Sequence, residues 1–127
     1  MTNITTVLLV DDDIVHRNVM AFDFKRRGFR VLHANTGREA WELILKENVN
    51  LVITDIRMPD GNGIELLRKI KDRDPQFPAV ILITGYTELN LTDAKDWGAV
   101  AVFPKPLDRK HLLSTSQAVV AQQGKKL

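Results

Sequence analysis

Short apolar segments alternate with longer amphipathic segments along the whole chain, and this alternation limits the folds that the chain can adopt. The apolar segments predict five strands, at residues 4–10, 29–34, 51–54, 79–83 and 100–103. The amphipathic segments predict five helices, at residues 13–27, 36–47, 64–73, 88–97 and 108–122. Strands that alternate with helices favour a parallel sheet, and right-handed crossovers place helices on both of its faces. We therefore predict a doubly wound α/β sandwich around a parallel five-stranded sheet.

Residues typical of helix ends stand at several of these predicted boundaries. Gly28 follows the first helix in the position where glycine commonly ends one. Thr36 and Glu39 match the capping box that opens a helix, and Asp108 is placed to cap the last one. These residues support the predicted order of elements independently of the apolar pattern.

The size of the chain fits one domain. It has 127 residues, of which 44% are apolar, and this is enough for a hydrophobic core. No repeat or linker interrupts the pattern, so we predict a single domain over residues 1–127, with its core at about 4–122 and a short tail at 123–127. The absence of cysteine excludes disulfide bonds and thiolate zinc sites.

The charge and hydropathy of the chain exclude several classes of partner. A net charge of +2, from 18 basic and 16 acidic residues, is too small to argue for direct nucleic-acid binding. The longest strongly apolar run, at 79–83, is far too short to cross a membrane, and the N-terminus lacks the basic start of a secretory signal. We expect a soluble, cytoplasmic protein.

Polar residues follow four of the five predicted strands. These residues are Asp11, Asp12 and Asp13, then Asp55, then Thr84, and finally Lys105 after Phe103 and Pro104. Ligands of such sheets bind beyond the carboxyl ends of the strands, and parallel strands bring those ends to one edge. A single aspartate there is an ordinary loop residue, but the whole set favours a chemical site.

The charges of this set indicate a cation and a phosphoryl group. Asp11, Asp12 and Asp55 bring three negative charges against one positive charge from Lys105. Clustered carboxylates repel one another unless a cation joins them, and an oxygen-rich site suits Mg²⁺. Asp55 could then act as a nucleophile that forms an acyl phosphate, while Lys105 and Thr84 bind its oxygens.

Other chemistries have weaker support in the sequence. The chain contains no glycine-rich phosphate loop of the GxxxxGK[ST] or GxGxxG type and no GxSxG nucleophile motif. Its three histidines, His16, His33 and His111, are scattered over different predicted elements. We interpret them as structural or surface residues.

Four segments, in this order and spacing, resemble the receiver domain of two-component response regulators, in the CheY-like superfamily: VLLVDDD, LVITDIRMP, VILITGYTE and GAVAVFPKP. The resemblance covers nearly the whole chain. It implies a flavodoxin-like (βα)5 fold with strand order 2-1-3-4-5. It also implies that Asp55 accepts a phosphoryl group from a phosphohistidine of a sensor histidine kinase or a histidine phosphotransfer protein.

The same resemblance implies a role for each residue of the expected metal site. Asp12 and Asp55 would bind Mg²⁺ directly, Asp11 would hold it through water, and the backbone carbonyl of Arg57 would be a further ligand. Arg57 could also modulate the reaction through its side chain.

The residues after the last two strands match the family as well. Thr84 and Lys105 match its hydroxyl and its lysine, and Pro106 matches the residue after that lysine, which commonly follows a cis peptide bond.

This sequence departs from the family at the position that usually carries an aromatic switch residue, three before the lysine, where Val102 stands. Phe103 is one position later and should point to the opposite face of the strand. Tyr86 could take over part of the switch role. The helix at 88–97 contains several poor helix formers, so we expect it to be short or mobile.

The resemblance implies that phosphorylation shifts a surface made by the fourth helix, the fifth strand and the fifth helix, and thereby controls a downstream protein or an output domain. The last predicted helix ends within about six residues of the C-terminus, so we expect either a stand-alone receiver or a domain of a longer protein. We do not expect an enzyme beyond self-catalysed phosphoryl transfer and slow self-dephosphorylation.

Two alternatives stay open. The first is a docking module with the same fold and no phosphorylation, for which the acidic set, Thr84 and Lys105 would be unnecessary. The second is a Mg²⁺-dependent phosphatase of the haloacid dehalogenase type. Such enzymes carry a second aspartate two residues after the nucleophile, where this chain has Arg57.

Overall fold

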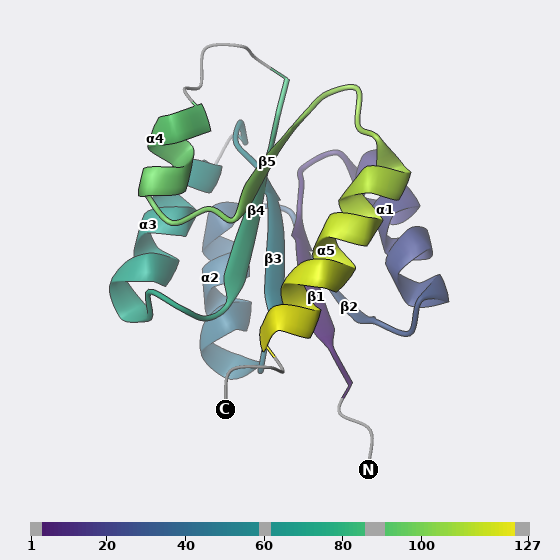
Figure 1. Ribbon diagram of the computed structural model, residues 1–127, viewed down its shortest axis with the longest axis horizontal. Coiled ribbons are helices and arrows are strands. Elements are labelled where there is room, and N and C mark those ends of the chain that lie inside the picture. The colour runs from purple at the N-terminus through teal and green to yellow at the C-terminus, as the bar shows by residue number, and fades with distance from the viewer. Residues whose placement is uncertain (1–3, 59–61, 86–90, 124–127) are drawn as a thin grey trace.

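The five strands form one parallel sheet in the order β2-β1-β3-β4-β5, in a computed structural model that describes residues 4–58, 62–85 and 91–123 (Figure 1). The strands are β1 (Thr6–Val10), β2 (Arg30–Ala34), β3 (Leu51–Asp55), β4 (Ala79–Thr84) and β5 (Ala101–Pro104). The helices are α1 (Ile14–Arg26), α2 (Gly37–Lys46), α3 (Gly63–Arg73), α4 (Leu91–Asp96) and α5 (Arg109–Gln123). The predicted fold class, element order and strand order are confirmed.

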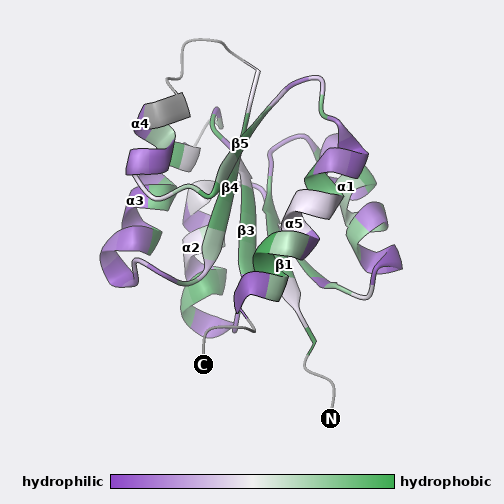
Figure 2. Cartoon of the chain, viewed as in Figure 1, coloured by the Kyte–Doolittle hydropathy of each residue, from purple (hydrophilic) through white to green (hydrophobic). Residues whose placement is uncertain are grey.

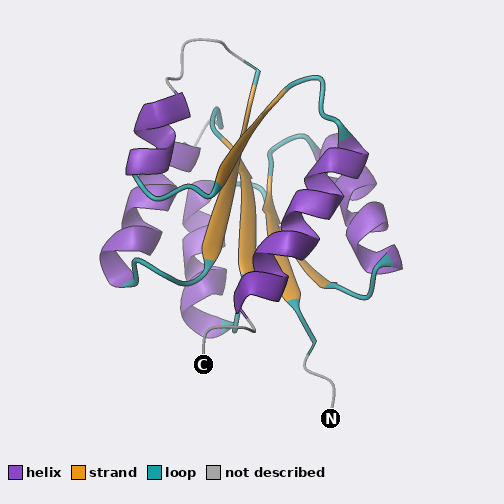
Figure 3. Cartoon of the chain, viewed as in Figure 1, coloured by secondary structure: helices purple, strands orange, loops and turns teal. Residues whose placement is uncertain are grey.

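Helices cover both faces of the sheet (Figure 3). Since side chains alternate along a strand, Val7 and Leu9 contact α1 and α5, whereas Leu8 and Val10 contact α2 and α3. The central strands are therefore apolar on both faces, as Figure 2 shows, and every residue of β1, β3 and β4 is buried.

Six predicted strand boundaries are wrong by one or two residues. Among them, β2 begins at Arg30 and not at 29, and β5 covers Ala101–Pro104 and not 100–103. The first strand begins at Thr6, where the backbone N–H first finds a partner, the Asn50 Oδ1 at 2.9 Å, while Ile4 is 69% exposed. The third and fourth strands end one residue later than predicted, because Asp55 pairs in register with Ile83, and Thr84 with Pro104. Asp55 and Thr84 are thus the last strand residues and not loop residues.

The helix ends follow the predicted chemistry. The side chains of Asp13, Thr36 and Asp108 accept hydrogen bonds from the backbone N–H three residues ahead, at 3.1 Å in each case. Gly28 has φ of +86° just beyond α1, a conformation that favours glycine.

The fourth helix is described over Leu91–Asp96, and the predicted start at 88 lies outside the described residues. Among the residues that the structure describes, no helix is long and apolar enough to cross a membrane.

Candidate functional site

The polar residues predicted to share one edge of the sheet do lie together, around a cleft of about 480 Å³ at the carboxyl ends of the strands. The cleft is lined by Asp11, Asp12, Asp13, Asp55, Arg57, Thr84, Gly85 and Lys105. These residues come from the ends of β1, β3, β4 and β5 and from the turns that follow. The parallel topology brings them together although up to 94 positions separate them, from Asp11 to Lys105.

Three carboxylates form the centre of this cleft. One oxygen from each of Asp11, Asp12 and Asp55 lies within 4.8 Å of the others. Asp11 is 1% exposed and Asp55 is 5% exposed, whereas Asp12 faces solvent. Three negative charges this close repel one another strongly where water is excluded, and only oxygen donors are present. The donor set therefore fits a hard divalent cation that keeps some of its water, such as Mg²⁺.

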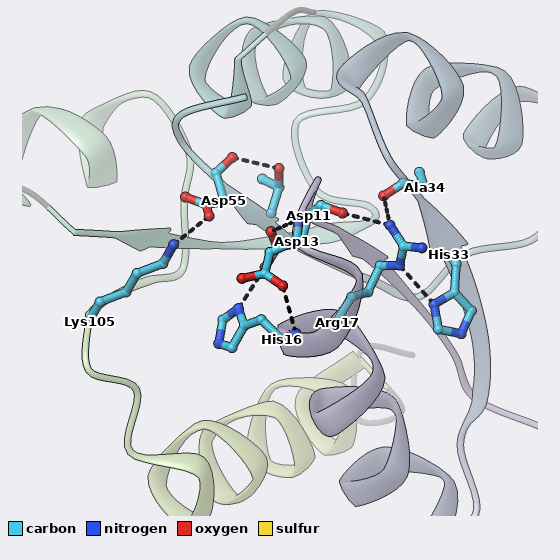
Figure 4. A network of polar contacts seen from close by, with 9 residues as sticks. Asp11, Asp13, His16, Arg17, His33, Ala34, Asp55 and Lys105 are labelled. Atoms are coloured by element: carbon cyan, nitrogen blue, oxygen red, sulfur yellow. Dashed lines mark hydrogen bonds and ion pairs between the residues drawn. The ribbon is translucent and has the colours of Figure 1, made fainter. Parts of the chain in front are cut away.

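Lys105 supplies a positive charge at the other side of the cleft. Its Nζ donates to the Asp55 Oδ2 at 2.7 Å (Figure 4). Burial disfavours the charged lysine, but the hydrogen bond to Asp55 and the attraction of the neighbouring carboxylates more than offset this and raise the pKa of Lys105. The ammonium thus stays charged beside Asp55.

The backbone on both sides of Lys105 positions this side chain. The Lys105 N–H donates to the carbonyl of Thr84 at 2.8 Å, which ties the end of β5 to the end of β4. The peptide bond to Pro106 is cis, as the resemblance implies. Thr84 is buried at the same edge and lines the cleft.

Close backbone packing beneath Asp55 requires a glycine at the start of α3. A Cβ atom at Gly63 would lie 2.5 Å from the backbone oxygen of Asp55, far inside contact distance. The Gly63 N–H donates to the carbonyl of Ile56 at 2.9 Å. The start of α3 is thus packed directly against the strand end that carries Asp55.

Arg57 lines the cleft with an exposed side chain. Its backbone carbonyl as a ligand of the cation stays a prediction.

Two residues of α1 belong to this site in addition to those predicted from the sequence. His16 Nδ1 lies 2.6 Å from the Asp11 Oδ2, so the residue interpreted from the sequence as structural or surface contacts a carboxylate of the cleft. Arg17, buried beside it, donates through Nη1 to the backbone oxygen of Asp11 at 2.6 Å. Both contacts are drawn in Figure 4.

Arg17 also joins α1 to the end of β2. Its Nη1 contacts the carbonyl of Ala34 at 3.2 Å and the Asn35 Oδ1 at 2.6 Å, and its Nε donates to the His33 Nδ1 at 3.1 Å. Burial, together with the positive charges of Arg17 and Lys25, lowers the pKa of His33, which keeps the ring in the neutral form that can accept this bond.

A sequence signal for Arg17 exists in hindsight. Arg17 stands three, four and seven residues before Met20, Ala21 and Phe24, which form the buried stripe of α1. This spacing places Arg17 on the same face of the helix. A basic residue that begins an apolar stripe next to the acidic strand end is placed to reach inward.

The residues near the missing aromatic lie on opposite faces of the sheet, as predicted. Phe103 is buried on the α1–α5 side, edge-on to His111 with ring centroids 5.0 Å apart. Val102 packs on the α2–α3–α4 side. Tyr86, the other candidate for the switch role, lies outside the described residues.

Comparisons with known proteins agree on one family. The sequence matches the response regulator receiver domain over residues 7–117. The chain is 34% identical to sporulation initiation phosphotransferase F of Bacillus subtilis over 103 residues, which cover 80% of this chain and 82% of that protein. A receiver domain structure from Methanospirillum hungatei has a TM-score of 0.91 at 31% identity and covers 98% of this chain and 100% of that one.

Other relatives are much longer than this chain. The transcriptional regulatory protein ZraR of Escherichia coli is 34% identical over 116 residues, which are 91% of this chain but 26% of that protein. The chain thus spans about a quarter of the length of this relative.

Proposed function

Because this chain belongs to the response regulator receiver domain family, we propose that it is a phosphoaccepting switch in which Asp55 takes up a phosphoryl group with the help of Mg²⁺. The observation that carries this proposal is the setting of the Asp55 carboxylate. It is 5% exposed, lines an open cleft, contacts one ammonium group and stands within 4.8 Å of two further carboxylates. A site built only for docking needs none of these charges.

The reaction at Asp55 follows from the positions of the surrounding groups. A carboxylate oxygen of Asp55 attacks the phosphorus atom of the donor, and an oxygen–phosphorus bond forms while the bond from phosphorus to the donor breaks. With a phosphohistidine donor, the electrons of the broken bond return to the imidazole nitrogen. The product is an acyl phosphate on Asp55 and a free histidine on the donor.

The neighbouring residues bind the incoming group. Lys105, now paired with Asp55, exchanges this contact for an oxygen of the phosphoryl group, and Thr84 is placed to donate its hydroxyl to another. Asp11, Asp12, Asp55 and the carbonyl of Arg57 would hold Mg²⁺. When bound, the cation offsets the negative charge that the donor and the three carboxylates bring together.

The wider role is part of the same proposal. The donor is a sensor histidine kinase or a histidine phosphotransfer protein, and the signal passes through the surface of α4, β5 and α5 to a downstream protein or an output domain. The chain acts as a phosphoacceptor that catalyses its own transfer and slow hydrolysis, and is no enzyme beyond that. The cytoplasmic location expected from the sequence belongs to the proposal.

Intact mass after incubation with acetyl phosphate and Mg²⁺ tests the proposal. We expect one added phosphoryl group on the unmodified protein and none on the Asp55→Asn variant. Asp23→Asn, which removes a carboxylate of α1 outside the cleft, is the matched control and should retain the adduct.

The other outcomes separate the alternatives. If the unmodified protein forms no adduct and does not respond to beryllofluoride, the fold serves only for docking. If the protein hydrolyses many equivalents of phosphate esters, it is a phosphatase. An adduct that persists in Asp55→Asn contradicts the assignment of Asp55.

A further inference from the structure

The Asp11 carboxylate is held at both of its oxygens by the beginning of α1. Its Oδ1 accepts the backbone N–H of Asp13 at 2.9 Å, and its Oδ2 lies 2.6 Å from the His16 Nδ1. A carboxylate oxygen only accepts hydrogen bonds, so the ring nitrogen must be the donor. The short distance is typical of a bond to a charged group.

These contacts close a ring of three hydrogen bonds. Asp13 caps α1, and its Oδ1 accepts the backbone N–H of His16 at 3.1 Å. The cap therefore fixes the position from which the His16 ring reaches Asp11, while the N–H of the capping residue itself reaches the other oxygen of Asp11. Figure 4 shows Asp11, Asp13 and His16 together, between Lys105 and Arg17.

We propose that His16 is a positioning residue for the cation site, because it holds the Asp11 carboxylate in the orientation that the cation requires. This inference rests on the proposed binding of Mg²⁺. His16 acts from outside the ligand set: the three oxygens within 4.8 Å of one another come from Asp11, Asp12 and Asp55, and no histidine of the described residues joins that group. An imidazole can donate this bond without carrying a charge.

The hydrogen bonds from Asp13 and His16 leave the Asp11 carboxylate able to bind the cation. Each carboxylate oxygen has two acceptor positions, so a bond from Asp13 or His16 uses only one of them. Asp11 is 1% exposed and would otherwise face the repulsion of Asp12 and Asp55 with no fixed orientation. Partners that orient a metal-binding group contribute about 10- to 100-fold to metal affinity.

Calorimetric titration with Mg²⁺ tests the proposal on the full chain. In His16→Leu the donor is lost, and we expect Mg²⁺ to bind about tenfold or more weakly. In His16→Asn the side-chain N–H₂ occupies the place of Nδ1, and we expect affinity close to that of the unmodified protein. His111→Leu, which removes an exposed histidine of α5, is the matched control and should leave Mg²⁺ binding unchanged.

The outcomes distinguish this inference from the proposed function. If the unmodified protein binds no Mg²⁺, the proposed cation site fails. If it binds Mg²⁺ and His16→Leu binds equally well or more tightly, only the role of His16 is overturned. Loss of binding in both His16 variants also overturns it, because a donor at the Nδ1 position would then not be the cause.

Nitrogen NMR of the unmodified protein provides a test that does not depend on the folding of a variant. We expect the proton on His16 Nδ1 to persist, hydrogen-bonded, at saturating Mg²⁺. Loss of that proton or a direct metal shift of the ring nitrogen would show that His16 leaves Asp11 or becomes a ligand, and either result contradicts the proposal.

Discussion

Asp11 and Asp55 are two buried carboxylates at the same edge of the sheet, yet they are held in different ways. Asp11 is bound by partners two and five residues away in the chain, through the N–H of Asp13 and the ring of His16. The side chain of Asp55 is bound by Lys105, which stands 50 residues away and approaches from the end of β5. The backbone of Asp11 is held as well, by the buried Arg17.

The difference suits two different tasks. A group of local hydrogen bonds built on a helix start keeps one geometry, so the Asp11 side of the cleft is a fixed support. A single contact to a long, partly exposed lysine can be exchanged for another anion at little cost, and the Asp55 side is where the proposed chemistry exchanges partners. Three substitutions test this comparison, beginning with the largest expected effect.

Replacing Arg17 with methionine should destabilise the Asp11 side of the cleft, because it removes the hydrogen bonds that join α1 to the ends of β1 and β2. The change leaves the carbonyl of Asp11 and the Asn35 Oδ1 without a buried donor, and we expect the free energy of unfolding to fall by about 3 kcal/mol. Urea unfolding measures this loss. Arg26→Met, on the same helix with its guanidinium over the ring of Phe22, is the control and should cost less than about 1 kcal/mol. Equal costs for the two variants would show that α1 does not hold this edge.

Replacing Lys105 with methionine should slow the phosphorylation of Asp55 and at the same time strengthen the binding of Mg²⁺. We expect the adduct at Asp55 to form about 100-fold more slowly, since a donor to the phosphoryl group is lost. We expect Mg²⁺ to bind more tightly, because a competing positive charge 2.7 Å from Asp55 is gone.

The time course of intact mass and a Mg²⁺ titration measure these two effects. The tighter binding is opposite in sign to the weaker binding expected for His16→Leu. If Mg²⁺ binds more weakly to both Lys105→Met and His16→Leu, then Lys105 and His16 both support the cation site. The proposed difference between Asp55 and Asp11 would then be wrong.

A third carboxylate, less buried than Asp11 and Asp55, gives a reference for these two. Asp23 of α1 forms two hydrogen bonds of 2.7 Å with Arg109 of α5, whose side chain is 51% exposed. The hydrogen bonds from Arg109, aided by the charges of Arg109 and Arg26 and opposed by burial, lower the pKa of Asp23 below its ordinary value. This carboxylate therefore contributes stability above its unfolded pKa, and the contribution is lost as the pH falls through the folded pKa.

Asp23→Asn should lower the free energy of unfolding by less than about 1 kcal/mol at neutral pH, because water screens an ion pair whose arginine is half exposed. The difference between the variant and the unmodified protein should shrink as the pH falls below about 4. Urea unfolding at a series of pH values measures both. A difference that stays constant into the acid range would mean that the ion pair is not its cause.

Much of the fold follows from local patterns in the sequence. Apolar runs such as 79–83 predict buried strands, and caps such as Thr36 mark helix starts, because both depend on neighbours within a few residues. The gathering of Asp11, Asp55 and Lys105 then follows from parallel topology, which brings strand ends to one edge. The ends of β3 and β4 were predicted one residue too early, because local patterns do not show strand pairing. An aspartate or a threonine stays in a strand when a neighbouring strand pairs with it.

His16 and Arg17 show what local patterns do not reveal. Three histidines scattered over the sequence carry no sign of which one will meet a carboxylate. The apolar stripe of α1 indicates that Arg17 turns inward, but it does not indicate which groups Arg17 binds. Only the packing of α1 against β1 and β2 decides that the ring of His16 reaches Asp11 and that Arg17 reaches the carbonyls of Asp11 and Ala34.

The amino-acid sequence by itself determined the order of strands and helices, the edge at which the polar residues meet and the identity of the three clustered carboxylates. The tertiary structure alone decided which partner each carboxylate received, Lys105 for Asp55 and His16 for Asp11. The physical reason is range: periodicity and capping depend on neighbouring residues, whereas a hydrogen bond depends on the distance between two side chains, and that distance exists only once the helices have packed on the sheet.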